Sequence, residues 1–259
     1  MRITDTHIHL NFAGMDEIRQ NLLESCIRRG ISSFIIPDVA VNNINQNISY
    51  PGCRFFFAAG VHPLYIANAP KLTLETVERG NYSAIGEIGM DLRKNIPHLP
   101  APNLQMEVFT EQLDIAAEMS LPLIIHCVRA HEQLLRLIKN NGFSCGGVVH
   151  GFTGSLETAR QWIKSGFKLG IGPFIVNPRM TDRQRRMLGS VGIENILLET
   201  DAPNNYIDQN FAIGVPVSLH NTLETVASIY GIDVEKAADI IESNVHSLFY
   251  ISIRCTDFH

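Results

Sequence analysis

Eight short, nearly continuous apolar runs recur along the chain and constrain its fold more than any other feature. Amphipathic stretches separate them, and no internal repeat or linker interrupts the pattern. Continuous apolar strands are typical of a parallel sheet covered on both faces, and eight strand–helix units in about 250 residues are typical of one barrel. We therefore predict an α/β fold, a single (β/α)8 TIM barrel domain over residues 1–259. The predicted strands are Ile3–His9, Phe34–Pro37, Phe55–Gly60, Ala84–Met90, Pro122–His126, Gly147–His150, Lys168–Ile171 and Ile196–Thr200.

A doubly wound open sheet is the alternative fold. The first predicted strand is followed by neither GxGxxG nor GxxxxGK[ST], so the usual nucleotide-binding fingerprints of such sheets are missing. Ser155 and Asp233 precede two of the amphipathic stretches as candidate helix N-caps, and Gly30 follows another as a candidate C-terminal cap.

Composition narrows the class of protein. Hydrophobic residues make up 45% of the 259 positions, which excludes a disordered chain, and the net charge of −5 disfavours a strongly basic nucleic-acid or membrane binder. The five scattered Cys form no CxxC pair, which indicates reduced thiols. Because Asp5 and two histidines break any signal-peptide core and no run of about 20 apolar residues occurs, we predict a cytoplasmic protein without a membrane partner.

The first predicted strand ends in Asp5-Thr6-His7-Ile8-His9, and 10 His in all occur in the chain. Side chains two positions apart share a strand face, so His7 and His9 can offer two imidazoles to one ion. The alternative reading is two side chains that simply fill a barrel.

Further candidate ligands lie at or near the ends of four other predicted strands: Glu87, His126, His150 and Asp201. In a parallel barrel these positions converge at the C-terminal mouth, where barrel active sites lie. A carboxylate in an apolar run, as at Glu87, is costly to bury unless it is paired or bound to a cation.

Histidines with carboxylates and without Cys suit Zn, Mn, Fe or Mg. Six ligands are too many for one tetrahedral ion, but they suit two ions about 3.5–4 Å apart that share a carboxylate and a hydroxide. We therefore predict two divalent metal ions (Mg, Mn or Zn) and hydrolytic chemistry.

Six motifs together resemble the TatD family of metal-dependent hydrolases, within the amidohydrolase-like TIM barrels, along nearly the whole chain. The run VVHGFTGSL is similar to the YjjV-like branch of that family in particular. The motifs are DTHIHL (5–10), GVHP (60–63), AIGEIGMDL (84–92), LPLIIHC (121–127), GVVHGFTGSLE (147–157) and LLETDAP (197–203).

The resemblance implies a division of the ligands. His7, His9 and Asp201 would hold one metal ion, His126 and His150 the second, and Glu87 would bridge them. Asp201, with Glu87 as the second catalytic residue, would orient or deprotonate the attacking water. The implied activity is that of a deoxyribonuclease or phosphodiesterase in which a metal-bridging hydroxide cleaves the phosphodiester bond.

Three more residues are candidates around this centre. His62 ends the third strand and is a candidate substrate contact or a structural residue. Glu199 shares a strand face with Asp201 and is a candidate partner for a metal-ligating residue, or a barrel-interior ion pair. Arg129 is a candidate substrate contact, although family members commonly carry Arg one position earlier, where this chain has Val128.

The loop after Asp201 also departs from the family, with Asn204-Asn205-Tyr206 in place of a Pro-Tyr-Leu run. These departures concern substrate identity more than hydrolysis. The alternatives are therefore a metallohydrolase acting on a small ester or amide, and a non-catalytic binding protein. Against the amidases, no bridging Lys follows the fourth strand, where Glu87 stands instead.

The expected substrate is a DNA end or a small phosphodiester, and a monomer is favoured. A net charge of −5 gives no overall attraction for DNA, so the metal ions themselves would supply positive charge at the scissile group.

A local basic cluster at Arg183, Arg185 and Arg186 is either a phosphate contact or a solvated helix face. The aromatic residues Phe152, Phe174 and Tyr206 are candidates to stack on a base or to fill the core.

Overall fold

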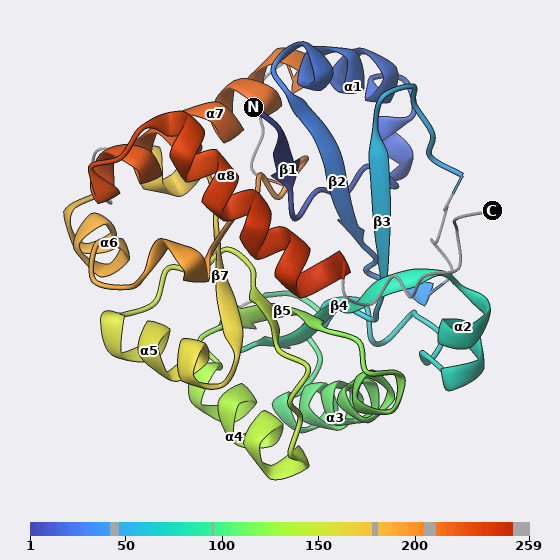
Figure 1. Ribbon diagram of the computed structural model, residues 1–259. Helices are drawn as coiled ribbons and strands as arrows, with labels where there is room; N and C mark the ends of the chain where they lie inside the picture. The colour runs from blue at the N-terminus through green and yellow to red at the C-terminus, as the bar shows by residue number, and fades with distance from the viewer. Residues whose placement is uncertain (42–46, 95, 178–180, 205–210, 251–259) are drawn as a thin grey trace.

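The structure is a computed structural model that describes residues 1–259 except 42–46, 95, 178–180, 205–210 and 251–259. Eight parallel strands form one sheet in the order of the sequence, β1 to β8, as predicted for a (β/α)8 barrel (Figure 1). Their bounds are β1 Ile3–Asp5, β2 Ile31–Pro37, β3 Arg54–Ala59, β4 Tyr82–Asp91, β5 Leu123–Val128, β6 Gly147–Val149, β7 Phe167–Ile171 and β8 Ile196–Leu198.

The first and last strands meet through the residues that follow them. The N–H of Thr6 donates to the Leu198 carbonyl at 2.9 Å, and beyond that point Ile8 and Ala202 form a parallel bridge. The predicted strands Ile3–His9 and Ile196–Thr200 are therefore shorter in the structure, because the regular ladder ends where the chain bends into the mouth. This seam nearly closes the barrel.

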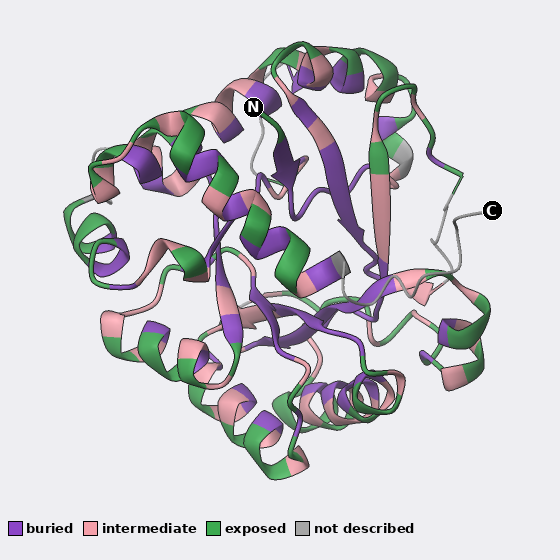
Figure 2. Ribbon diagram, in the orientation of Figure 1, coloured by how far each residue is buried: buried purple, intermediate pink, exposed green. Residues whose placement is uncertain are grey.

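Helices cover the outside of the sheet, with their buried faces toward the strands and their exposed faces outward (Figure 2). Ser155 is an N-cap as predicted, since its Oγ accepts from the Thr158 N–H at 3.1 Å, whereas Asp233 makes no such side-chain bond. Gly30, with φ of 77°, follows α1 as predicted. The helices are α1 Arg19–Arg28, α2 Leu74–Arg79, α3 Pro102–Met119, α4 His131–Asn141, α5 Leu156–Lys164, α6 Thr181–Leu188, α7 Phe211–Tyr230 and α8 Val234–Val245, with 3-10 turns η1 Ala13–Met15, η3 Pro173–Val176 and η4 Ile193–Asn195 and the π-turn η5 His246–Tyr250.

The core has two parts. A large cluster packs the outward faces of the strands against the helices. A smaller cluster takes one apolar residue from each of six strands, and Val245 and Phe249 of the α8–η5 segment join it. Side chains therefore fill the barrel, as in other barrels of this kind, and the polar residues of interest lie past the strand ends. Within the described residues, no helix is long and apolar enough to cross a membrane.

Candidate metal centre

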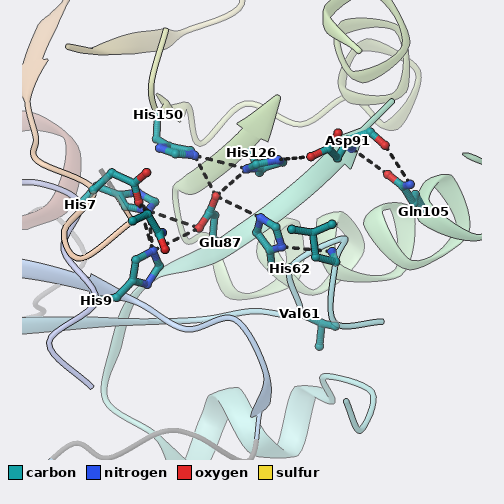
Figure 3. Close-up of polar contacts among 12 residues, drawn as sticks. His7, His9, Val61, His62, Glu87, Asp91, Gln105, His126 and His150 are labelled. Atoms are coloured by element: carbon teal, nitrogen blue, oxygen red, sulfur yellow. Dashed lines mark hydrogen bonds and ion pairs between the residues drawn. The ribbon is translucent and has the colours of Figure 1, made fainter. Parts of the chain in front are cut away.

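The predicted ligand candidates converge at the C-terminal mouth of the barrel. Glu87 lies within β4 and His126 within β5, while the other members follow the ends of their strands. Figure 3 shows Glu87 between two groups of imidazoles. A cavity of about 520 Å³ lies at this mouth, lined by His9, His62, Glu87, His126, His150 and Asp201 among others, whereas His7 is fully buried beneath it.

The two carboxylate oxygens of Glu87 face different partners. Oε2 lies 3.3 Å from His7 Nε2 and 3.7 Å from His9 Nε2. Oε1 lies 2.8 Å from His126 Nδ1 and 2.9 Å from His150 Nε2. The side chain is therefore shared between two clusters of nitrogen atoms (Figure 3).

Asp201 completes the first cluster. Its Oδ1 lies 3.4 Å from His9 Nε2 and 3.8 Å from His7 Nε2, and the two Nε2 atoms are 3.3 Å apart. Asp201 adopts φ of 56°, a left-handed conformation that Asp tolerates better than most residues. Its N–H donates to the His7 carbonyl at 2.8 Å, which fixes the two ligand candidates to each other.

The second cluster contains a third imidazole. His150 Nε2 lies 3.4 Å from His126 Nδ1, and His62 Nε2 lies 3.5 Å from Glu87 Oε1. The Nδ1 atom of His62 accepts from the Leu64 N–H at 3.1 Å, so its ring orientation is fixed by the loop after β3. His62 thus belongs to the site geometry.

Two glycines let β4 carry Glu87 into this position. A Cβ at Gly86 would lie 2.5 Å from the Ile124 Cβ, and a Cβ at Gly89 would lie 1.9 Å from the His126 carbonyl oxygen. β4 and β5 therefore approach more closely than side chains would allow. The Glu87 N–H donates to the Asp38 carbonyl at 2.8 Å, which anchors the backbone from the other side.

Both carboxyl groups are ionised near neutral pH. Burial raises the pKa of Glu87, but the charges of His150, His62 and His7 outweigh it and hold the pKa well below its usual range. Burial also raises the pKa of Asp201, while its hydrogen bond with His9 and the charge of His7 lower that pKa to about 2. Burial lowers the pKa of His7, which favours the neutral imidazole that binds metals.

The clustered side chains fit divalent metal ions. Two ligand atoms that each lie about 2.1 Å from a tetrahedral ion are about 3.4 Å apart. The distances of 3.3–3.8 Å among His7 Nε2, His9 Nε2, Asp201 Oδ1 and Glu87 Oε2 match that spacing. Nitrogen atoms with acceptor lone pairs and carboxylates lie close together at a buried position, an arrangement that a cation stabilises.

The remaining sequence candidates divide between the site and the surface. Glu199 is buried, with Oε1 3.6 Å from His150 Nδ1 and 2.5 Å from the Gly151 N, from which it accepts a hydrogen bond.

Arg129 is exposed and does not belong to the cavity lining, whereas Val128 does. Phe174 lines the cavity, Phe152 is buried, and Tyr206 lies outside the described residues. The basic residues Arg183, Arg185 and Arg186 are exposed on α6, away from the cavity lining.

Sequence reasoning missed several residues that support the site. Asp91 is buried at the end of β4, and its Oδ2 lies 3.3 Å from His126 Nε2. Asp5 is fully buried and accepts from the Thr200 Oγ1 at 2.6 Å and the Thr200 N–H at 3.0 Å. The signal for Asp91 was available, because Asp91 stands four positions after Glu87 on the same face of one strand.

Comparisons with known proteins extend this picture. The family model for TatD related DNase matches residues 4–250. YjjV of Escherichia coli K12, an uncharacterised metal-dependent hydrolase, is 28% identical over 96% of this chain and 98% of its own length. Its crystal structure superposes with a TM-score of 0.83 at 26% identity, covering 96% of this chain and 98% of that chain. The 3′–5′ ssDNA/RNA exonuclease TatD of Escherichia fergusonii is 28% identical over 96% of this chain and 99% of its own length.

A parallel barrel with a histidine–carboxylate cluster at its C-terminal mouth defines the class of metal-dependent hydrolases, and this chain is one of them. More particularly, it belongs to the TatD related DNase family, as the motifs had indicated.

Proposed function

We propose that the protein is a dinuclear phosphodiesterase that cleaves DNA ends or small phosphodiesters. The observation that carries this proposal is the position of Glu87, with each carboxylate oxygen directed at a different pair of histidines. A carboxylate shared in this way is typical of a bridge between two ions. The nuclease names of relatives such as TatD of Escherichia fergusonii support the nucleic-acid substrate.

In this proposal His7, His9 and Asp201 would hold one ion, His126 and His150 would hold the other, and Glu87 would be shared between the two. Two divalent ions in such a centre supply an activated water and positive charge at the phosphoryl oxygens. Asp201 would orient or deprotonate the attacking water. The low pKa of Asp201, about 2, keeps its carboxylate ionised and able to accept a hydrogen bond.

His62 is the candidate substrate contact. It is the third imidazole near Glu87 Oε1, and burial lowers its pKa. A neutral His62 donates from Nε2, because its Nδ1 already accepts the Leu64 N–H. That N–H group is suited to a phosphoryl oxygen.

The test measures metal content and turnover together. Protein purified without chelator is analysed for bound metal and assayed on bis-p-nitrophenyl phosphate and on 3′-labelled single-stranded DNA. We expect about two ions per chain, fewer in Glu87→Gln, and turnover that falls at least 100-fold in Glu87→Gln and Asp201→Asn. The control is Glu194→Gln, which removes an exposed carboxylate beside β8.

Each outcome has a defined consequence. Absence of bound metal with turnover unaffected by either site variant overturns the proposal. Turnover of the simple diester without turnover of DNA replaces nucleic acid by a small phosphodiester. Turnover of small esters or amides in preference to both favours the alternative metallohydrolase.

A further inference from the structure

Arg93 lies at the edge of the cavity, just after β4, and is not one of the proposed metal ligands or catalytic residues. Its side chain is 42% exposed and lines the cavity that contains Glu87, His126 and Asp201. Among the lining residues that the structure describes, Arg93 is the sole Lys or Arg. The cationic side chains suggested by the sequence, Arg129 and the α6 cluster, are absent from that lining.

Asp91 holds the Arg93 guanidinium in a defined orientation. Arg93 Nε lies 2.9 Å from Asp91 Oδ2 and Nη2 lies 2.5 Å from the same oxygen, while the Arg93 N–H donates to Oδ1 at 3.0 Å. Gln105 fixes Asp91 in turn, accepting from its N–H at 2.8 Å and donating to its carbonyl at 3.0 Å. Arg93 therefore loses little further conformational freedom when it binds a ligand.

The ion pair leaves part of the guanidinium available. Arginine has five N–H donors in a planar fork, and Asp91 uses those on Nε and Nη2. Within the described part of the chain, no group accepts a hydrogen bond from Nη1. A fork with donors left over, beside a cavity, is suited to the oxygens of a phosphate.

The Asp91 carboxylate contacts both Arg93 at the cavity edge and His126 of the candidate metal centre. Asp91 Oδ2 also lies 3.3 Å from His126 Nε2, and the Nδ1 of that ring lies 2.8 Å from Glu87 Oε1. Arg93 is thus separated from Glu87 by Asp91 and His126, so it does not reach the group held at Glu87. It is placed to contact the next anionic group along a bound substrate.

We propose that Arg93 binds a second phosphate of the substrate, one that flanks the scissile phosphodiester. This inference rests on the proposed phosphodiesterase function and narrows its substrate class to phosphorylated nucleotide chains rather than isolated diesters or neutral esters. Arg93 is then a specificity-determining residue, and Asp91 is its positioning residue.

The test compares substrates that differ by one phosphate. The metal-loaded enzyme is assayed on the dinucleotide dTpdT and on its forms with a 5′- or a 3′-terminal phosphate. A charge-assisted hydrogen bond to phosphate is worth about tenfold or more, so we expect wild type to favour one phosphorylated form by at least about tenfold in kcat/KM, mainly through KM. Arg93→Gln should reduce this preference to less than about twofold, and Arg93→Lys should restore part of it.

Lys94→Gln is the matched control, because it removes the same charge from the neighbouring exposed residue, which is absent from the cavity lining. Binding is measured separately from turnover by calorimetry, with analogues whose internal phosphate is replaced by an uncharged methylphosphonate. Wild type should bind the terminally phosphorylated analogue more tightly by at least about tenfold, and Arg93→Gln should not.

The outcomes separate this inference from the proposed function. If wild type shows no preference for a terminal phosphate, or if Arg93→Gln weakens all three substrates equally, Arg93 acts only through Asp91 and the inference fails while the phosphodiesterase stands. If no phosphodiester is cleaved, the proposed function fails, and the analogue binding still decides whether Arg93 contacts phosphate.

Discussion

Replacing Glu199 by Gln tests whether a buried carboxylate supports the histidine next to it. Glu199 Oε1 lies 3.6 Å from His150 Nδ1, on the far side of the ring from Glu87. Changing a carboxylate that lies beside a histidine in a metal site typically costs 10–100-fold in metal affinity, or about 1.4–2.7 kcal/mol. The Gln side chain keeps the size of Glu199 but lacks its negative charge, so we expect a loss near the lower limit, about tenfold.

Glu199→Ala should cost more. It removes the carboxylate altogether and also leaves the partly buried Gly151 N–H without its partner, which costs up to about 1–3 kcal/mol. We therefore expect about 100-fold weaker metal binding together with lower protein stability.

The assay is a titration of chelator-treated protein with Zn²⁺ or Mn²⁺ against a competing indicator, with thermal unfolding as a check on folding. Glu194→Gln is the control, since it alters an exposed carboxylate in the turn that precedes β8. If Glu199→Gln binds both ions within twofold of wild type, Glu199 does not support His150, and the barrel-interior ion pair is the better interpretation.

Three further predictions concern stability. Phe249 of η5 is fully buried in the barrel interior. Phe249→Ala should therefore lower the free energy of unfolding, measured in urea, by about 3–5 kcal/mol. An unchanged midpoint of urea unfolding would contradict the place of Phe249 in the core. Gly89→Ala, at φ of 148° and against a backbone oxygen, should cost at least about 2 kcal/mol, whereas Gly142→Ala, at φ of 77° with no atom within 4 Å, should cost less. Burial raises the pKa of Glu242 although it accepts two hydrogen bonds from Thr4, so the folded state keeps its proton to higher pH than the unfolded state. Wild-type stability relative to Glu242→Gln should then fall as pH rises from the unfolded-state pKa of about 4.3 through the higher folded-state pKa, and a difference that does not change with pH would refute this.

The sequence was sufficient to predict the barrel and the residues at its mouth. Apolar runs mark strands buried on both faces, and every predicted run overlaps a strand of the sheet, although each strand differs from its prediction at one end or both. Because the C-terminal ends of parallel strands meet at one mouth, His7, His126 and Asp201 could be expected together from their positions alone. That inference needs no knowledge of how the loops fold.

Residues past the strand ends were harder to place, because loop backbone rather than strand period directs them. Arg129 has φ of 58° and is exposed, while Arg93, which the sequence did not single out, lines the cavity. The direction of the Arg93 side chain depends on its ion pair with Asp91, two positions earlier, whose backbone is bonded to Gln105. The strand period places Asp91 on the same face as Glu87, but it does not predict that the Arg93 side chain pairs with Asp91.

The seam between β1 and β8 has a consequence for the order in which the site forms. Glu87, His126 and His150 come from consecutive strands, so their cluster assembles from neighbouring sequence. The cluster with His7 and Asp201 exists only when the two ends of the barrel sequence have met, since Asp5 and Thr200, which bond across the seam, are 195 residues apart. During synthesis the first strand therefore cannot complete its cluster until the last strand has been made. A local opening of the seam separates His7 and His9 from Asp201, while the cluster of Glu87, His126 and His150 keeps its geometry.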